Sequence, residues 1–180
     1  NMMSVAHGGL ALLDCYQEDV FMSFLPLSHT MERTVGYYLC VMSGSSVAYA
    51  RSVAQLGEDL ITIRPTILVA VPRIFERIYG RISDQMEKKG SLAKKLFEMT
   101  VSIGWKRFLH QQGRGPWPLG SLFWPLLERV VASKVVSRLG GRIRVAISGG
   151  AALNEEIARV FIGLGVPIVQ GYGLTETAPI

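Results

Sequence analysis

Short apolar runs alternate with helical patterns along this chain of 180 residues, and this alternation constrains the fold more than any other feature. The runs have the length of buried strands, and they cover residues 19–24, 45–50, 66–71, 142–147 and 166–169. Strands that alternate with helices favour a parallel sheet, because parallel neighbours need a crossover connection. The sequence therefore predicts an α/β fold in which helices wrap a parallel sheet.

Helical patterns fill the intervals between these runs. They are predicted for residues 31–42, 52–64, 73–112, 123–139 and 155–162. Ser52 and Gln55 have the spacing of a capping box, and Asn154 is of a residue type that starts helices. Gly44 and Pro65 mark the ends of the first two helices.

The predicted helices over 73–112 and 123–139 exceed a simple crossover, and a loop with glycines and prolines separates them at 113–120. We therefore expect a helical insertion at about 73–139. A chain of 180 residues is one domain by default, so residues 1–180 are interpreted as a single unit that carries this insertion.

Composition and charge narrow the class of protein. The net charge of +5 favours anionic partners in general and identifies none. Cys15 and Cys40 lie far apart without metal-ligand spacing, which is typical of reduced thiols in an intracellular protein. No apolar run reaches the roughly 18 residues of a spanning helix, and no signal peptide follows Asn1. Because the chain begins without methionine, we expect a piece of a longer protein.

Candidate binding residues follow the predicted strands. Ligands of open parallel sheets bind beyond the carboxyl ends of the strands. Four such loops carry Ser28-His29, Pro72-Arg73, the glycine-rich segment 148–151 and the segment 171–176. We expect the last two loops to lie side by side at one edge of the sheet.

The segment 171–176 has residue types that suit a nucleotide and a metal ion. Glycines allow a close approach of backbone to a flat ligand, and Tyr172 can stack its ring on a purine. Thr175 can donate a hydrogen bond to a phosphate. Glu176 would repel phosphate directly, but Mg²⁺ between them removes that conflict, because Mg²⁺ is commonly held by a carboxylate and substrate phosphates.

Simpler interpretations exist for each element. Gly-Tyr-Gly and Ser-Gly-Gly are ordinary turns when taken alone, and His29 can simply cap a helix. The basic helical stretch can be a solvated face, and Trp117, Phe123 and Trp124 can belong to a core. Only the joint placement of these elements at one sheet edge favours a binding site.

The motifs "VQGYGLTETAP" and, upstream of it, "ISGGAAL" resemble those of adenylate-forming enzymes. "FLPLSHTMERT" and "ILVAVPRIFERIYGRI" are similar to long-chain fatty acyl-CoA synthetases, and the insertion that follows is similar too. The resemblance covers nearly the whole chain. It implies the central part of an N-terminal adenylation domain, in which a carboxylate reacts with ATP and Mg²⁺ to give acyl-AMP, and the acyl group then passes to coenzyme A.

The resemblance also implies roles for individual residues. The adenine and acyl pocket would be lined by Gly149, Gly150 and Ala151, and the purine would be framed by Gln170, Gly171, Tyr172, Gly173 and Leu174. Thr175 would hold phosphate, Glu176 would hold Mg²⁺, and His29 would lie near the reacting carboxylate. Some relatives carry a tunnel-gating tryptophan where this chain has Arg33, so gating by that side chain is in doubt.

What the chain lacks matters as well. The phosphate loop is expected before Asn1, and the ribose-binding aspartate and mobile C-terminal domain are expected after Ile180. The fragment alone is therefore expected to be inactive. The rival hypotheses are a non-catalytic nucleotide-binding or interaction module and, among enzymes, an aryl or short-chain acyl ligase.

The expected partners are fatty acid, ATP and coenzyme A, without nucleic acid, and a homodimer is a further expectation. The stretch 81–114 is basic and contains interleaved apolar residues, which suggests peripheral contact with a membrane. The expected location is therefore the cytoplasm, with contact on the inner face of the membrane.

Overall fold

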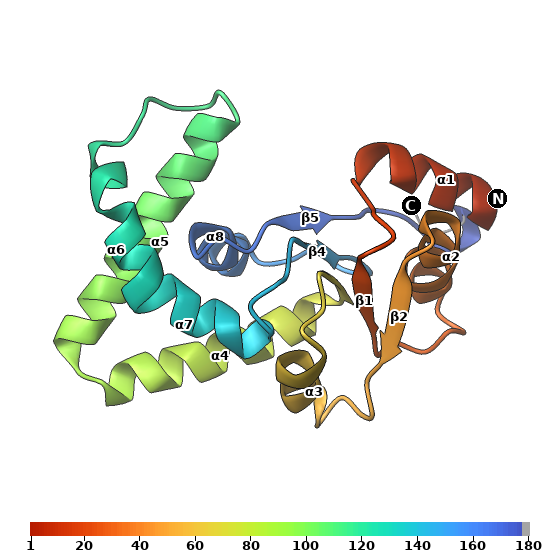
Figure 1. The fold of residues 1–180 in the computed structure, drawn as a ribbon, viewed down its shortest axis with the longest axis horizontal. Coiled ribbons are helices and arrows are strands. Elements are labelled where there is room, and N and C mark those ends of the chain that lie inside the picture. Colours follow the sequence, from red (N-terminus) through yellow and green to blue (C-terminus); the bar gives the residue numbers. More distant parts are fainter. Residues whose placement is uncertain (178–180) are drawn as a thin grey trace.

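The computed structural model describes residues 1–177 and contains a parallel sheet with the strand order β2-β1-β3-β4-β5. Its strands are β1 Val20–Ser23, β2 Ser46–Tyr49, β3 Ile67–Ala70, β4 Val145–Ser148 and β5 Ile168–Gln170. Figure 1 shows helices around this sheet and a helical arm that extends from it. Each strand overlaps a run that the sequence predicts, and β4 and β5 end one residue beyond their runs, so the α/β class and the parallel sheet are confirmed.

The strands are aligned closely along their length. Phe21 of β1 lies opposite Ile67 of β3, which lies opposite Val145 of β4. At the far end of β4, Ser148 lies between Ala70 and Gln170. The carboxyl ends of β1, β3, β4 and β5 therefore meet at one edge within about one residue, and the loops that follow them are neighbours.

Helices cover both faces of the sheet, and each face has its own apolar core. One face carries α1 Met2–Leu12, the π-helical turn η1 Glu32–Tyr38 and α2 Leu39–Ser43, which pack on Phe21, Val69 and Ile147. The other face carries α3 Leu56–Ile63, α4 Pro72–Lys88 and α8 Glu155–Gly163, which pack on Met22, Leu68 and Ala146. Neighbouring residues of a strand point to opposite faces, which explains this division.

Local signals explain several helix ends. The Asn154 side chain accepts hydrogen bonds from the amides of Glu156 at 2.8 Å and Ile157 at 3.3 Å, as its predicted cap role requires. Gly44 ends α2 with a φ of 72°, a left-handed conformation that favours glycine. Ser52 and Gln55 do contact each other, but they form a turn before α3 rather than its first residues.

Two helical expectations need correction. The helical stretch predicted over 73–112 is divided into two helices, α4 and α5 Ser91–Gln111, because Gly90 between them adopts a φ of 89° and changes the direction of the chain. Helix α1 was not predicted at all, since its glycines at 8 and 9 weaken a helical pattern. It forms because tertiary packing buries Ala6 against α2 and the sheet.

The arm continues after α5 through η2 Leu119–Phe123, α6 Trp124–Leu127, η3 Glu128–Ala132, α7 Ser133–Val136 and η4 Ser137–Leu139. Its attachment to the sheet depends on close contact between α5 and α8. A Cβ on Gly104 would collide with the carbonyl oxygen of Gly163, and one on Gly163 would lie 2.5 Å from the Val101 carbonyl oxygen. Phe97 and Val101 are buried in this contact, so the apolar stripe of α5 faces inward.

No helix among residues 1–177 is both long enough and apolar enough to cross a membrane.

A buried carboxylate connects three strands at their amino ends. Asp19 precedes β1 and accepts hydrogen bonds from the Thr66 hydroxyl at 2.7 Å, the Tyr16 amide at 2.8 Å and Arg144 at 2.5 Å. Thr66 precedes β3, and Arg144 precedes β4. Burial alone would raise the pKa of Asp19, but the hydrogen bonds from Arg144, Thr66 and Tyr16 outweigh it and lower the pKa.

Asp19→Asn tests this connection, because it keeps the side-chain shape and removes the charge. We expect it to reduce the stability of the full-length protein by about 2 kcal/mol near neutral pH, seen as a lower Tm. Since the pKa of Asp19 is lowered on folding, its contribution is complete above a pH of about 4 and is lost as the pH falls through the folded-state pKa. The difference between variant and native protein should therefore shrink in acid. Asp14→Asn, at an exposed position, is the matched control, and an equal loss in both variants would contradict the assignment.

Candidate functional site

The loops after β4 and β5 lie side by side at the carboxyl edge of the sheet, as predicted. The Gly171 amide donates to the Ser148 carbonyl at 2.9 Å, and the Gly149 amide donates to the Ala70 carbonyl at 3.2 Å. These bonds extend the strand pairing by one residue into both loops. The segments 148–151 and 171–176 are therefore adjacent and face the same side of the molecule.

Both glycines of the first loop are required by geometry. Gly149 is buried, and a Cβ at this position would collide with the sulfur of Met31 and lie 3.5 Å from the Gly171 carbonyl oxygen. Gly150 has a φ of 81°, which side chains other than glycine rarely adopt. Ala151 is exposed at the tip of the loop. The backbone here is bare and accessible, which suits the close approach of a flat ligand.

The loop after β1 reaches the same edge. His29 is exposed, and its Nδ1 accepts a hydrogen bond from the Met31 amide at 3.3 Å, so it caps the helix as the simpler interpretation holds. A neutral ring with Nδ1 as acceptor carries its proton on Nε2, which can then donate to a ligand. Met31 contacts Gly149, and this contact joins the His29 loop to the glycine loop. The cap and a binding role are therefore compatible.

Arg33 folds back onto the same loop. Its Nε donates to the Leu27 carbonyl at 3.1 Å, so its side chain braces the loop that holds His29. Arg73 also lies at this edge, on the first turn of α4 after Pro72, and it is exposed.

The second glycine loop presents polar and aromatic groups to solvent. Tyr172 is 84% exposed, so its ring is free to stack on a ligand. Thr175 and Glu176 are exposed in the short turn η5 Thr175–Thr177. Residues 178–180, which include the last two residues of the "VQGYGLTETAP" motif, lie outside the described residues.

Glu176 suits one kind of metal ion. Residues 1–177 contain no group of three or more His, Cys, Asp or Glu side chains that could hold a metal by themselves. An exposed single carboxylate beside a hydroxyl instead fits Mg²⁺ that substrate phosphates also coordinate. These donors therefore fit a nucleotide-bound Mg²⁺.

An apolar cavity of about 600 Å³ adjoins these loops. Helix α1, the η1–α2 segment and the end of β5 form its walls, and its lining includes Val35, Leu39, Ile147, Val169 and Tyr172. Residues of the predicted purine frame, from Gln170 to Tyr172, thus also border a cavity of hydrocarbon character. The sequence did not indicate this cavity, because one of its walls is the unpredicted helix α1.

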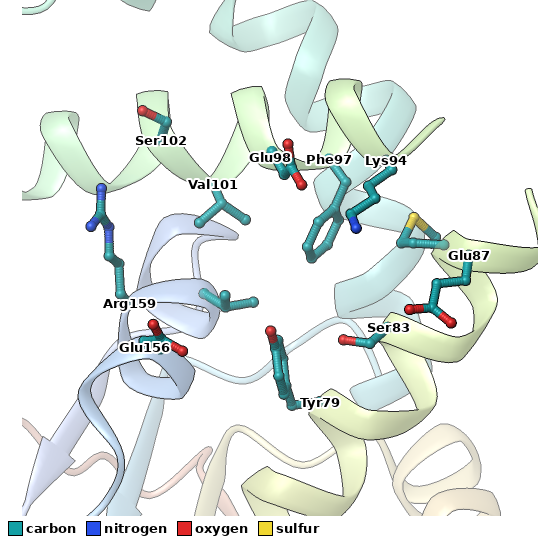
Figure 2. Close-up of a pocket in the computed structure, with 12 residues that line it drawn as sticks. Tyr79, Ser83, Glu87, Lys94, Phe97, Glu98, Val101, Ser102, Glu156 and Arg159 are labelled. Carbon is teal, nitrogen blue, oxygen red and sulfur yellow. The ribbon is translucent and has the colours of Figure 1, made fainter. Parts of the chain in front are cut away.

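A second cavity, of about 440 Å³, lies between α4, α5 and α8. Figure 2 shows Tyr79 and Ser83 of α4, Phe97 of α5 and Glu156 of α8 around it. Neither a strand-end loop nor any residue that the sequence marked as a site residue contributes to its lining. We therefore place the candidate site at the sheet edge and not in this cavity.

A buried carboxyl, which the sequence analysis did not single out, lies next to Met31. Glu32 is 0% exposed, and its carboxyl lies where a side chain at position 36 would be, which explains Gly36 one turn later. Burial raises the pKa of Glu32 to about 6, and the Ser23 hydroxyl offsets only part of the penalty. Neither carboxyl oxygen makes a hydrogen bond of normal geometry with any described residue. The sequence did contain one indication of this burial. A glycine follows Glu32 by four residues, and its missing side chain leaves room for the carboxyl on the same side of the helix.

The whole of residues 1–180 matches the family model described as AMP-binding enzyme. A long chain acyl-CoA synthetase 7, peroxisomal, from Arabidopsis thaliana is 32% identical over 180 residues. Fatty acyl-CoA synthetase A from Dictyostelium discoideum is 32% identical over 178 residues. These alignments cover 99% and 98% of this chain, but only 24% and 25% of the relatives. The chain thus spans about a quarter of the length of these curated relatives.

Solved structures share the fold. The adenylation domain of a carboxylate reductase from Mycobacterium chelonae has a TM-score of 0.60 and 22% identity, over 88% of this chain and 21% of that one. The A domain of a carboxylic acid reductase from Segniliparus rugosus, in complex with AMP and a co-purified carboxylic acid, has a TM-score of 0.58 and 27% identity. That match covers 90% of this chain and 21% of that one.

Glu32→Gln tests the buried carboxyl. The pKa of about 6 in the folded state lies above the ordinary 4.5, so the proton is held more tightly after folding. Its stabilising effect is complete below the ordinary pKa and is lost as the pH rises through about 6. The variant cannot ionise, so it should exceed the native protein in stability by up to about 2 kcal/mol near pH 8 and hardly at all near pH 4. Thermal unfolding of the full-length protein over this range measures it. Exposed Glu128→Gln is the control, and a difference independent of pH would argue against a buried, ionising Glu32.

Proposed function

This chain belongs to the AMP-binding enzyme family, and we propose that it is the central part of the adenylation domain of a long-chain fatty acid–CoA ligase. The observation that carries the proposal is the pairing of two glycine loops at the carboxyl edge of the sheet with an apolar cavity beside them. The glycine loops suit a nucleotide, and the apolar cavity suits a hydrocarbon chain. The domain is proposed to span 1–180, with the helical insertion at about 73–139.

The proposed reaction has two steps. A carboxylate oxygen of the fatty acid attacks the α-phosphorus of ATP, the bond to the β-phosphate bridging oxygen breaks, and acyl-AMP and pyrophosphate form. The thiol sulfur of coenzyme A then attacks the acyl carbonyl, loses its proton, and displaces AMP to leave acyl-CoA. Negative charge moves in both steps, so positioned hydrogen-bond donors and cations stabilise the transition states.

The residues of the candidate site are given these roles. Backbone of Gly149, Gly150 and Ala151 lies against the adenine and the start of the acyl group, and Tyr172 stacks on the purine. Gln170, Gly171, Gly173 and Leu174 complete the purine frame. The Thr175 hydroxyl donates to a phosphate, and His29 donates from Nε2 to the reacting carboxylate. Support comes from the exposure of Tyr172 and from the Met31 contact that joins the His29 loop to Gly149.

Mg²⁺ is proposed as the partner of Glu176. When bound, the ion neutralises phosphate charge and so lowers the barrier to displacement of pyrophosphate. The carboxylate orients the ion through its exposed oxygens, and it brings no repulsion to the phosphates once the ion lies between them.

The apolar cavity is proposed to take the acyl chain. Its volume of about 600 Å³ exceeds the needs of an acetyl or propionyl group, and its walls carry mainly aliphatic side chains. This observation favours a long-chain substrate over the rival short-chain or aryl ligase. A non-catalytic nucleotide-binding module is the other rival. Binding of a nucleotide alone does not require a large apolar cavity beside the nucleotide loops, so the cavity does not favour this rival.

Further partners remain proposals. These are coenzyme A as the acceptor, a homodimer and a cytoplasmic location. The expected membrane contact through 81–114 gains no support from the packing of α5. In that stretch Phe97 and Val101 pack against α8, so the side that faces outward is mainly the charged one.

Glu176→Ala in the full-length enzyme is expected to lower acyl-AMP formation by a factor of about 100 or more, because it removes a contact to the metal that stabilises the transition state. Tm should stay within about 1 °C of the native value, since the side chain is exposed. Fatty-acid-dependent exchange of pyrophosphate into ATP measures the reaction. The control is Glu155→Ala, an exposed glutamate on α8, and normal exchange by the Glu176 variant at ordinary Mg²⁺ would refute the metal role.

Val169→Trp tests the acyl cavity. Val169 lies opposite Ile147, shares its face of the sheet and is half exposed, so a larger side chain enters the cavity without disturbing the core. We expect kcat/KM to fall about tenfold or more for a long-chain acid while a short-chain acid is spared. Val169→Ala should keep both activities. Equal loss with all chain lengths would place the acyl group elsewhere.

A further inference from the structure

The helical run at 119–139 carries apolar side chains on two opposite sides. One side is in the core of the arm, where Trp124, Leu127, Ala132 and Val135 are buried. The other side faces solvent. Its members are Leu119 at 80% exposure, Leu122 at 72%, Phe123 at 64%, Leu126 at 62% and Val130 at 39%.

These exposed residues form a single face. Their spacings from Leu119 are three, four, seven and eleven residues, which is typical of one side of a helix. The run itself consists of short 3-10, α- and π-helical segments. Trp117, half exposed, lies just before the first of them. Scattered surface leucines are ordinary, but a contiguous apolar face of this kind marks an interaction surface. We call residues 119–130 with this exposed side the outer face.

The surroundings of the outer face are strongly basic. Between residues 99 and 142 the only acidic residue is Glu128, and the basic residues are Lys106, Arg107, Arg114, Arg129, Lys134, Arg138 and Arg142. None of these seven forms an ion pair with any residue in the range 1–177. Arg107 instead covers the buried Trp124 at 4.6 Å. Arg114, Arg129 and Lys134 are exposed and lie within or close to the outer face in the sequence.

The position of the outer face suits contact with an extended surface. Helix α6 and the connection that precedes it lie at the end of the molecule opposite α1 and β2 (Figure 1). A flat partner at this end can therefore approach without meeting the sheet.

We propose that the outer face docks on the surface of an anionic lipid bilayer. Leucine, phenylalanine and tryptophan side chains enter the boundary between headgroups and acyl chains, while Arg114, Arg129 and Lys134 contact anionic headgroups. Tryptophan favours the interfacial level, which suits Trp117 at the start of the face. A symmetric contact with a second copy is disfavoured, because it would place one basic surface against another.

This inference moves the membrane contact away from α5. The apolar residues Phe97 and Val101 of α5 are buried against α8, whereas those of the outer face are open to solvent. It does not depend on the proposed ligase reaction, since a membrane contact stands or falls by vesicle binding alone.

The first experiment is co-sedimentation of the full-length protein with vesicles of equal parts phosphatidylcholine and phosphatidylglycerol. We expect binding that weakens with added salt, because screening reduces the attraction of the basic residues. Replacing Leu122, Phe123 and Leu126 together by serine should abolish binding and leave acyl-AMP formation intact. Neutralising Arg114, Arg129 and Lys134 to glutamine should weaken binding about 100-fold. Leu92→Ser, at an 81% exposed leucine of α5, and Lys94→Gln with Lys95→Gln are matched controls that should bind as the native protein does.

If the triple variant failed to fold, its loss of binding would not identify the contact. A second variant therefore tests the same face with a single apolar substitution. Leu122→Trp keeps an apolar residue at the face, and its fluorescence should be quenched by lipids brominated along their acyl chains. Leu92→Trp should show no quenching beyond that of the native tryptophans.

The proposal is overturned if the native protein does not bind these vesicles, or if pure phosphatidylcholine binds it equally well. It is also overturned if the triple variant binds normally, or if Leu92→Trp is quenched as strongly as Leu122→Trp. Absence of vesicle binding together with a dimer that the triple variant loses would assign the outer face to a second copy. Absence of binding together with a lower Tm of the triple variant would assign it to another segment of the full-length chain.

Discussion

The hydrogen-bonded group of Asp19, Thr66 and Arg144 is the constraint on which the rest of the structure depends. Each residue directly precedes a different strand, so one carboxylate sets the relative height of β1, β3 and β4 at their amino ends. The strands are short, and their alignment passes unchanged to the carboxyl edge. A slip by one residue in any of them would turn its buried side chains to the wrong face. Its residues lie far apart in the chain, so the group forms only when the tertiary structure is in place.

At the carboxyl edge, bare backbone and packing support each other. Met31 presses its sulfur onto Gly149, and this contact holds the loop after β1 against the loop after β4. Two residues near this edge lie in environments unusual for their type: the aromatic Tyr172 is exposed, and the acidic Glu32 is buried. A buried carboxyl without normal hydrogen bonds costs stability, whereas the exposed ring of Tyr172 contributes little to folding. Such local costs are typical of sites whose purpose is binding rather than folding.

The helical arm carries the proposed docking surface, which is separate from the proposed binding site at the sheet edge. Gly104 and Gly163 let α5 approach α8 closely, and this fixes the arm rigidly to the sheet. The arm carries the outer face at the end of the molecule opposite α1 and β2 (Figure 1). The proposed binding site and the outer face thus lie on different parts of the chain, because the glycine loops follow β4 and β5 and the outer face belongs to the arm.

Periodicity and turn residues were enough to predict the approximate strands, the parallel class of the sheet and the adjacency of the 148–151 and 171–176 loops, because parallel strands end at one edge. The break at Gly90, the formation of α1, the apolar cavity, the burial of Glu32 and the two-sided character of residues 119–139 could be seen only in the folded chain. These depend on which surfaces meet: the buried and exposed leucines of the arm are the same residue type at helical spacing, and only contact with α5 distinguishes Leu127 from Leu126.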